Sequence, residues 1–358
     1  MRLSSVEVIP YALPFKEPYV TARGVLQRRE MVLLRVRDED GVEGLGEAVP
    51  LALRGGVGLE EVVRELEGWA EHGSVEGLSA LARCAVETAL MDLRGRRVGK
   101  GLGEGERDEA VECNATLVAG TPEAVAAEAE KWAREGFTTF KLKLGAESAR
   151  NIPQGSFSRT RGSTDVEQVR ALREALGPEV RIRVDANEAW DLETAKATLA
   201  ELEPFGIELA EQPVAGLEGM AELAASTSIP LAADESVASL EEAEEAAALG
   251  ACAYTGIKLS KVGGPDAALA IADVLPAYVT SALDGPVGIA AAAQVAISLA
   301  ETGHPERLHL AHGLATQRLF ASTIAAVECE IRDGMLHLPP GPGLGVEIDE
   351  EALQAHRI

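Results

Sequence analysis

The pattern of hydrophobic and polar positions along the chain changes near residue 111. Before that point, residues 2–11 and 30–37 alternate or run apolar as strands do, and the turn EDGVEG at 39–44 leads into a further apolar stretch. Two segments have the spacing of amphipathic helices, 59–71 and 76–95. The pattern predicts a small α+β domain over residues 1–110, with an antiparallel sheet and two helices.

From residue 111 onward, short apolar runs alternate with helical segments rich in Ala, Glu and Leu. Eight of the runs are candidate strands: 111–117, 138–144, 181–187, 206–212, 230–235, 253–260, 277–283 and 307–312. The segments 191–203, 238–249 and 264–274 are expected to be helices between them. Eight such repeats predict an α/β fold of the (β/α)8 barrel type over 111–327. The turn-rich tail, 328–358, is expected to pack back on the first domain.

Four charged residues mark the ends of consecutive predicted strands. Asp185, Glu211 and Asp234 are 26 and 23 residues apart, and Lys258 lies 24 residues further on. This is the interval of one strand plus one helix in a (β/α)8 barrel, whose chemistry takes place at the C-terminal strand ends. For any one of them, a charge that is only solvated or paired with a helix N-terminus is the alternative. Four on consecutive strands favour a shared site.

The second predicted strand adds two lysines to this site. Lys141 and Lys143 lie two residues apart, so both side chains point to one face of the strand, which in a barrel is the interior. Adjacent ammonium groups lower each other's pKa, so we expect one to be neutral near pH 7 and to act as a base. Lysines that extend to solvent are the alternative. Lys258 should face this pair; its rival Lys261 lies past the strand end at an odd offset, which turns it to the other face.

The three carboxylates indicate a hard divalent cation. With no His or Cys next to them in the sequence, their oxygens suit a partly hydrated Mg²⁺, with Mn²⁺ as a substitute. Such a cation holds a substrate carboxylate and stabilises the negative charge that forms when the adjacent proton leaves. A lysine on each side permits proton removal on one face and stabilisation or reprotonation on the other. The predicted reaction class is proton abstraction α to a carboxylate.

The composition of the chain limits the classes of partner that it can bind. The formal net charge is −25, whereas nucleic acids and anionic membranes require a basic surface, so we expect neither as a partner and a small-molecule carboxylate as the substrate. The N-terminus has no basic-then-apolar leader, and no apolar run is long enough to span a bilayer, which predicts a cytoplasmic protein. A homo-oligomer is compatible with the sequence. Four cysteines without CxxC spacing are expected to be reduced core residues: Cys84, Cys113, Cys252 and Cys329.

At these motifs the chain resembles the enolase superfamily, and within it the muconate-lactonizing subgroup. The motifs follow the subgroup's order: KxK at 141–143, DAN at 185–187, EQP at 211–213, DES at 234–236 and IKLSKVGG at 257–264. The resemblance implies that the three carboxylates bind Mg²⁺, that Lys143 is the base and that Lys258 is its counterpart. It implies supporting roles for Lys141, Asn187, Gln212 and Glu235. It also implies that the first domain is a capping domain, completed by the tail, whose loops near 14–29 and 50–56 close over the substrate.

The segments SALDGPVGIAAA at 281–292 and AHGLAT at 311–316 resemble strand ends of the o-succinylbenzoate synthases of this superfamily. Those enzymes dehydrate a cyclohexadiene carboxylate in menaquinone biosynthesis, so the resemblance implies a carbon–oxygen lyase. Substrate binding is then expected at Ser281, Gly288 and Gly313, where small residues leave room and offer N–H donors.

Other activities of the superfamily stay open as alternatives. Dipeptide epimerases carry an acidic motif after the eighth strand, whereas this chain has His312-Gly313-Leu314 there. N-succinylamino acid racemisation is compatible with the same site. Asp284 keeps the epimerase alternative open, although it also fits as a cap for a helix that starts near Val287. A barrel that has lost catalysis and only binds a ligand is a different alternative, and the intact set of lysines and carboxylates argues against it.

An insert departs from the family pattern. The run NIPQGSFSRTRGST at 151–164 has no acidic residue in a strongly acidic chain, and it follows a strand, so it should lie on the catalytic face. A basic flap for an anionic substrate and an ordinary surface loop are the two interpretations. Thr164 and Glu167 after it have the spacing of a capping box at the start of a helix.

Overall fold

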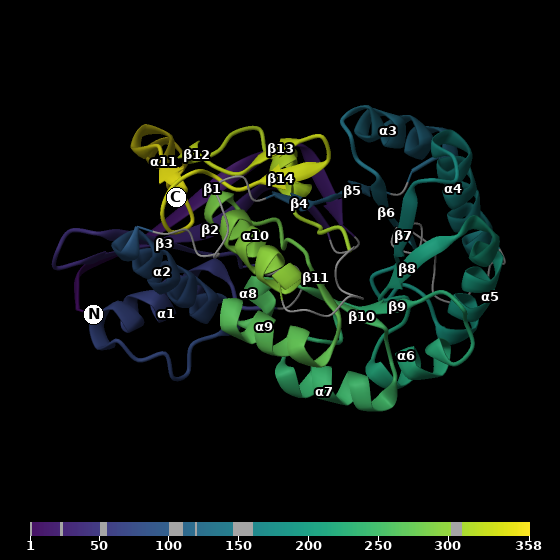
Figure 1. The fold of residues 1–358 in the computed structure, drawn as a ribbon, viewed down its shortest axis with the longest axis horizontal. Coiled ribbons are helices and arrows are strands. Elements are labelled where there is room, and N and C mark those ends of the chain that lie inside the picture. Colours follow the sequence, from purple (N-terminus) through teal and green to yellow (C-terminus); the bar gives the residue numbers. More distant parts are fainter. Residues whose placement is uncertain are drawn as a thin grey trace.

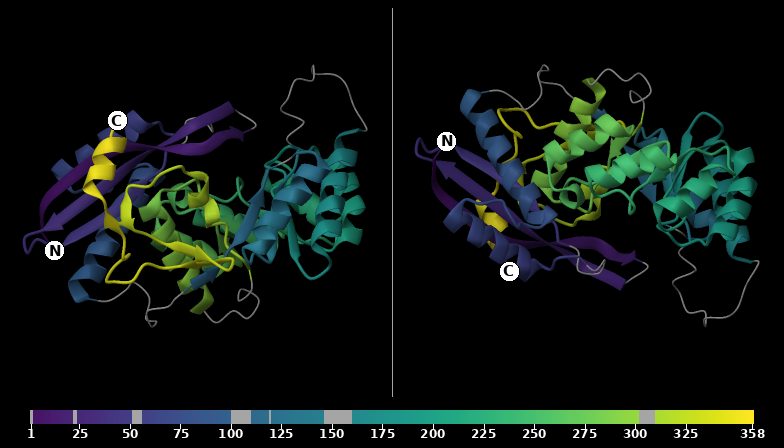
Figure 2. Two further views of the ribbon diagram at one scale, coloured as in Figure 1. Left: turned by 90° about the horizontal axis from the view of Figure 1, so that it is seen from above. Right: turned by 90° about the horizontal axis from the view of Figure 1, so that it is seen from below.

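The structure is a computed structural model that describes residues 2–21, 24–50, 56–99, 110–118, 120–145, 160–301 and 310–358. An N-terminal sheet with two helices lies beside a curled, mainly parallel sheet surrounded by helices (Figure 1). The views from above and from below in Figure 2 show the C-terminal segment, drawn in yellow, next to the N-terminal strands.

The N-terminal sheet is antiparallel, with strand order β1 (Leu3–Thr21), β2 (Gly24–Asp38) and β3 (Glu43–Ala48). Helices α1 (Leu59–His72) and α2 (Ala80–Val98) belong to the same part, as the sequence predicted. A Cβ atom on Gly44 or Gly46 would overlap the backbone of α2 at Ala89 or Ala85. Glycine at these two positions therefore lets the helix lie directly on the strand.

One expected capping loop is a strand. The described residues of the predicted loop 14–29 belong to β1 and β2. Pairing between the two strands is interrupted after Pro14 and resumes where Tyr19 lies opposite Leu26. Pro14 and Pro18 make this segment look unlike a strand in the sequence, because proline has no N–H to donate to a ladder. The hairpin nevertheless continues past them. The expectation of a loop over 14–29 was therefore wrong. In the second predicted loop, residues 51–55 lie outside the described residues.

Seven parallel strands form the barrel sheet. In spatial order from one edge they are β11 (Ala277–Val279), β10 (Tyr254–Ile257), β9 (Leu231–Ala233), β8 (Ile207–Glu211), β7 (Arg181–Asp185), β6 (Thr139–Lys143) and β5 (Asn114–Leu117). Most residues of these strands are buried, as expected for a parallel sheet covered by helices. The predicted first strand is divided, because β4 (Ala110–Glu112) pairs with β14 (Met335–His337) in another sheet.

In the described residues 310–313, the predicted eighth strand is represented by single β-bridges at His312 and Gly313. His312 exchanges backbone hydrogen bonds with Glu112 and Asn114 at 2.7 and 2.9 Å, and Gly313 with Val279 and Ser281 at 2.8 and 3.1 Å. These bonds join the two edges of the seven-stranded sheet. A strand over 307–312 was therefore wrong for its described residues, 310–312, although the barrel closes at the expected place.

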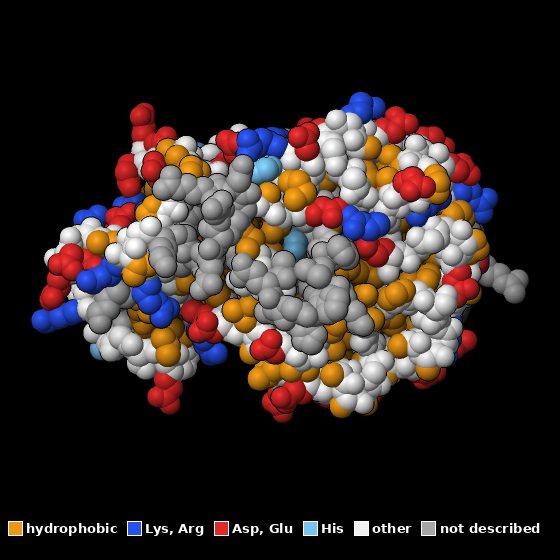
Figure 3. Space-filling view, in the orientation of Figure 1, with side chains coloured by type: hydrophobic (Ala, Val, Ile, Leu, Met, Phe, Trp, Pro, Cys, Tyr) orange, Lys and Arg blue, Asp and Glu red, His pale blue; other side chains and the backbone are white. Residues whose placement is uncertain are grey.

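Helices surround the barrel sheet (Figure 1). Along the chain they are α3 (Pro122–Arg134), α4 (Thr160–Leu176), α5 (Leu192–Leu202), α6 (Leu217–Ala224), α7 (Leu240–Leu249), α8 (Leu259–Val262), α9 (Pro265–Val274) and α10 (Pro286–Glu301). Among the helices that the structure describes, none is both long and apolar enough to cross a membrane. On the face drawn in Figure 3, Lys and Arg side chains are interspersed with acidic ones. All four cysteines are free, as expected.

The capping-box prediction at Thr164 and Glu167 was wrong. Helix α4 already begins at Thr160, so Thr164 lies inside it. Residues three apart share a helix face, and the same spacing therefore also occurs in a helix interior. Of the insert 151–164, residues 151–159 lie outside the described residues.

The C-terminal segment returns to the N-terminal sheet. It forms β12 (Ala325–Val327), β13 (Glu330–Arg332), β14, β15 (Glu347–Ile348) and α11 (Glu350–His356). The backbone N–H of Ile358 donates to the carbonyl of Pro10 at 3.2 Å, and that of Ala321 donates to Pro14 at 2.8 Å. The tail thus completes the capping part, as predicted.

The capping sheet and the barrel meet at a buried carboxylate. Glu47 at the end of β3 is 2% exposed and accepts hydrogen bonds from the N–H of Gly285 at 2.6 Å and the hydroxyl of Tyr11 at 2.8 Å. Gly285 directly precedes α10, so a side chain of the capping part satisfies an N–H at the start of a barrel helix. A Cβ on Gly288 would lie 2.7 Å from Glu47 Oε1. The glycines therefore permit this approach of the two parts.

Asp284 does not cap α10 as the sequence suggested. Its carboxylate turns back and accepts hydrogen bonds from the hydroxyl of Ser281 and the N–H of Ala282, both at 2.6 Å. The two carboxylates both lie beside Gly288, where a Cβ atom would be 2.7 Å from Glu47 Oε1 and 3.1 Å from Asp284 Oδ1. Burial, and then the charge of Asp284, raise the pKa of Glu47 to about 7.

We predict that Glu47→Gln changes how stability depends on pH. A carboxyl group whose pKa rises on folding stabilises the fold while it is protonated, and this contribution is lost between pH 4.5 and about 7. Glutamine keeps the acceptor for Gly285 and does not titrate. As the pH rises through this window, the wild type should lose up to about 3 kcal/mol of unfolding free energy that the variant does not lose. Urea unfolding at pH 5 and pH 8 measures the difference.

Glu60→Gln, at an exposed position on α1, is the control and should follow the wild type at both pH values. If the Glu47→Gln and wild-type unfolding free energies run parallel between pH 5 and pH 8, Glu47 does not titrate in this window.

Candidate active site

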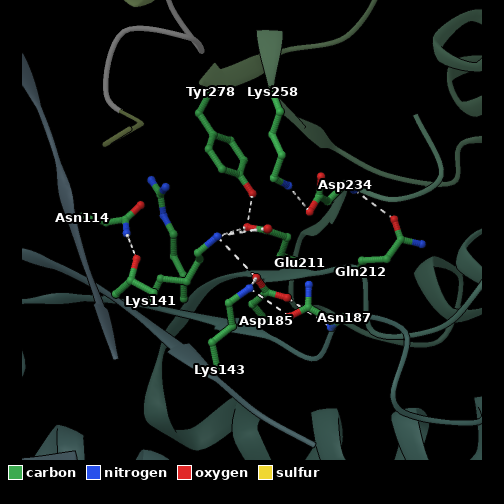
Figure 4. Close-up of polar contacts among 12 residues, drawn as sticks. Asn114, Lys141, Lys143, Asp185, Asn187, Glu211, Gln212, Asp234, Lys258 and Tyr278 are labelled. Atoms are coloured by element: carbon green, nitrogen blue, oxygen red, sulfur yellow. Dashed lines mark hydrogen bonds and ion pairs between the residues drawn. The ribbon is translucent and has the colours of Figure 1, made fainter. Parts of the chain in front are cut away.

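The predicted acidic residues lie together at the C-terminal ends of the barrel strands. Asp185 and Glu211 are the last residues of β7 and β8 and face each other across the ladder, and Asp234 directly follows β9. All three carboxylates are buried, with at most 1% exposed. Figure 4 shows them converging with Lys141, Lys143 and Lys258. The structure thus brings together the side chains whose spacing in the sequence predicted a shared site.

Each carboxylate contacts a lysine. Lys141 Nζ donates to the two oxygens of Glu211 at 3.0 and 2.9 Å and lies 3.3 Å from Asp185 Oδ2. Lys143 donates to Asp185, and Lys258 donates to Asp234. Buried charges are tolerated when they are paired and hydrogen bonded, and this network provides both.

The pKa of Lys143 is shifted in the direction opposite to the one expected from the sequence. Burial alone would lower it, but the charges of Asp185 and Glu211 outweigh burial and raise the pKa above its ordinary value. Lys258 behaves in the same way, since Asp234 and Glu211 outweigh burial. The expectation was that one lysine of the pair would be neutral. For Lys143 it does not hold in this arrangement, because carboxylates at contact distance outweigh a neighbouring ammonium group.

Lys261 also reaches the site, contrary to the prediction. Its Nζ donates to the backbone carbonyl of Asp234 and to its Oδ1, the latter at 3.1 Å. The strand alternation did not apply because β10 ends at Ile257 and Lys258 is already the residue before helix α8. Lys258 and Lys261 are three residues apart at the start of a helix and therefore point to the same carboxylate.

Asn187, Gln212 and Glu235 connect the strand ends. Asn187 accepts from Lys143 Nζ at 2.9 Å and donates to Glu235 Oε1 at 2.9 Å. Gln212 accepts the N–H groups of Asp234 and Ser236 at 2.9 and 3.2 Å. Its amide nitrogen donates to Ser236 Oγ and to the carbonyl of Val214 at 2.7 and 2.9 Å. These bonds hold the turns after β7, β8 and β9 in a fixed relation.

Asn187 and Gln212 have unusual backbone conformations. Their φ angles are 46° and 37°, in the left-handed region that residues other than glycine rarely adopt. Such strain persists only where the surroundings fix the conformation, and it is frequent at functional sites.

Of the predicted substrate-binding residues, Ser281 and Gly313 lie at the seventh and eighth strand ends, and Gly288 lies in the first turn of α10. Ser281 bonds to Asp284, Gly313 belongs to the closing segment, and Gly288 lies against Glu47 of the capping part. The contact with Glu47 gives Gly288 a structural reason to be glycine. The substrate-binding roles of all three stay predictions.

Sequence reasoning did not single out Tyr278 and Arg183. Tyr278 is completely buried, and its hydroxyl donates to Glu211 Oε2 at 2.6 Å. Burial, and then the charge of Glu211, raise the pKa of Tyr278 far above its usual range, so the hydroxyl stays a donor. Arg183 is completely buried and stacks on this ring, with Cζ 5.0 Å from the ring centroid. Arg183 precedes Asp185 by two residues, so the same strand alternation that identified the lysine pair could have found it.

The donor chemistry of the site fits a hard divalent cation. Asp185, Glu211 and Asp234 offer carboxylate oxygens only, the ligand type that Mg²⁺ takes. Within the described ranges no group of three Asp, Glu, His or Cys side chains already has the geometry of a metal centre. The carboxylates instead direct their oxygens to lysines, which supply the compensating positive charge.

The chain belongs to the enolase superfamily. Residues 124–352 match the family described as enolase C-terminal domain-like, and residues 4–67 match the mandelate racemase / muconate lactonizing enzyme N-terminal domain. The resemblance predicted from the sequence motifs is therefore confirmed, and so is the barrel with its capping domain.

Known relatives in this family carry different activities. The chain is 30% identical to muconate cycloisomerase 1 of Pseudomonas putida, covering 97% of this chain and 96% of the relative. It is 27% identical to an o-succinylbenzoate synthase of Geobacillus stearothermophilus, over 96% and 93%. A dipeptide epimerase from Cytophaga hutchinsonii, solved with Mg and the dipeptide D-Ala-L-Val, superposes with a TM-score of 0.85 at 26% identity, covering 99% and 98%. A shared fold does not select one of these activities.

We predict that Gln212→Leu is destabilising by about 2–4 kcal/mol. Leucine has a similar volume but leaves the buried N–H groups of Asp234 and Ser236 without their acceptor, which costs more than the bonds themselves contribute. Equilibrium unfolding in urea measures the change. Gln294→Leu, a buried glutamine on α10, is the control and should cost less. Equal losses of unfolding free energy in the two variants would show that the hydrogen bonds of Gln212 do not contribute more to stability than those of another buried glutamine.

Proposed function

We propose that the protein is an o-succinylbenzoate synthase-like lyase, which removes the proton α to a carboxylate and then eliminates water. The placement of Lys143 and Lys258 carries this proposal. They lie on β6 and directly after β10, and the three strands between them end in the carboxylates. A substrate held at those carboxylates has a lysine on each side (Figure 4).

Asp185, Glu211 and Asp234 would hold Mg²⁺, or Mn²⁺ as a substitute, and the cation would supply positive charge for a substrate carboxylate and its enediolate. Lys143, once neutral, takes the α-proton. Lys258 faces the other side and stabilises the negative charge as an ammonium group. The proton on Lys143 then passes to the departing hydroxyl, which leaves as water. Asp185 and Glu211 raise the pKa of Lys143 although burial opposes them, and a cation held by the same carboxylates would weaken this effect and so favour the neutral amine.

The strand ends support a synthase over a dipeptide epimerase. A dipeptide presents an ammonium group that calls for an acidic partner, and residues 310–327 contain no Asp or Glu. Asp284 is the acidic residue nearby, but it is 7% exposed and its carboxylate is engaged by Ser281 and Ala282. An uncharged succinyl-binding surface built from small residues fits this region better. We propose a role in menaquinone biosynthesis because the segments at 281–292 and 311–316 resemble those of o-succinylbenzoate synthases.

Muconate cycloisomerisation is the second candidate. The 30% identity to the Pseudomonas putida cycloisomerase over nearly the whole chain favours it. The same two lysines and carboxylates serve either reaction, because both pass through an enediolate next to a carboxylate. N-succinylamino acid racemisation would use them as well, with each lysine acting on one face.

We predict that Lys143→Ala and Lys258→Ala each lower turnover by about 100-fold or more, because one loses the base and the other loses charge stabilisation. Exchange of the substrate α-proton with D₂O, followed by NMR, separates the two roles and should disappear in Lys143→Ala. Lys131→Ala, on an exposed face of α3, is the control and should keep wild-type rates. Undiminished exchange in Lys143→Ala would assign the base to another residue.

We predict formation of o-succinylbenzoate from the cyclohexadiene carboxylate precursor, with slower racemisation of N-succinylamino acids and little action on unblocked dipeptides. Absorbance and chiral chromatography with purified protein and Mg²⁺ measure these rates side by side. A muconate should be converted at a lower kcat/KM than the precursor. A dipeptide or a muconate as the best substrate would replace the synthase assignment, and no turnover of any of the four would favour a barrel that only binds a ligand.

A further inference from the structure

Glu211 differs from the other two site carboxylates in its partners. Asp185 and Asp234 receive side-chain hydrogen bonds from lysines only, among the described residues, whereas Glu211 Oε2 also accepts the hydroxyl of Tyr278 at 2.6 Å. Tyr278 lies on β11, three strands away from β8 in the sheet, and reaches Glu211 across the barrel interior (Figure 4). A donor from a distant strand therefore fixes the orientation of this carboxylate.

The ring of Tyr278 is held on two sides. Arg183 stacks over it from β7, and the guanidinium of Arg183 is itself anchored by the carbonyl of Ala311 at 2.6 Å and by Glu208. On the side of β10, Gly256 makes room, since a Cβ there would lie only 3.3 Å from the Tyr278 hydroxyl. The hydroxyl thus has little freedom to turn away from Glu211.

We propose that Tyr278 is a positioning residue for Glu211, which orients the carboxylate so that one oxygen is left for a divalent cation. This inference rests on the proposed function, in which Glu211 is a metal ligand. Tyr278 donates to Oε2, and Lys141 bridges both oxygens. With Oε2 held by Tyr278, Oε1 is the oxygen that can exchange its lysine contact for the cation. Partners of metal ligands typically change metal affinity by 10- to 100-fold when they are removed.

The test is Tyr278→Phe, which removes only the hydroxyl and keeps the ring under Arg183. Isothermal titration with MgCl₂ should give a Kd about 10- to 100-fold higher than for the wild type, with a normal melting transition before the metal is added. In turnover assays the same loss should be recovered largely at high Mg²⁺, because the defect is in metal binding. A merely structural role would lower the melting temperature and leave the Mg²⁺ affinity unchanged.

Tyr11→Phe is the matched control. Tyr11 is also completely buried and also donates its hydroxyl to a carboxylate, Glu47, but at the boundary with the capping part. Its Mg²⁺ affinity should equal that of the wild type. An equal rise in Kd for both variants, or no rise for Tyr278→Phe, would overturn the inference.

Two further outcomes are informative. If the wild type gives no heat with MgCl₂ and EDTA leaves its activity unchanged, the metal part of the proposed function fails, and the inference fails with it. If Tyr278→Phe does not fold, Gly256→Ala replaces it, because the added Cβ displaces the hydroxyl without removing it. A Kd raised several-fold in that variant supports the inference, and an unchanged Kd contradicts it.

Discussion

The burial of three carboxylates at the strand ends is the constraint on which the rest of the site depends. Removing such charges from water costs several kcal/mol for each ion unless they are paired and hydrogen bonded. The protein compensates Asp185, Glu211 and Asp234 with four lysines, two from strand β6 and two at the start of α8. Two of these lysines, Lys143 and Lys258, are also the residues proposed to remove the proton and to stabilise the negative charge. The same ion pairs that compensate the buried carboxylates therefore hold the proposed catalytic side chains in place.

The same principle joins the capping part to the barrel. Arg29 of β2 is 3% exposed and donates to the carbonyls of Val49 and Ala282 at 2.9 and 3.2 Å, next to the strand end that carries Ser281. Glu47 accepts hydrogen bonds from the N–H of Gly285 at the start of α10 and from the hydroxyl of Tyr11. Hydrogen bonds of buried polar side chains thus connect the capping sheet to the barrel next to the proposed substrate region.

Regular spacing explains which predictions from the sequence held. The interval between Asp185, Glu211 and Asp234 is dictated by a repeating strand and helix, so their convergence could be predicted. The lysine pair on β6 followed from strand alternation in the same way. Where the chain leaves a strand, the rule fails: Lys261 lies in a helical turn and points to Asp234, although alternation turned it away. Asp284 bonds backwards because Glu47, 237 residues earlier in the chain, already occupies the helix start.

The sequence by itself determined the family, the barrel with its capping domain and the set of charged residues at the strand ends, because these depend on local periodicity and on motifs. Only the tertiary structure decided how the charges are paired and in which direction the pKa values of Lys143 and Lys258 are shifted. It also decided that the described residues 310–313 close the barrel through bridges at His312 and Gly313, and that Tyr278 reaches Glu211. The reason is physical. Periodicity fixes the direction of a side chain within its own element, whereas its partner and its pKa depend on charges and hydrogen bonds contributed by elements far away in the chain.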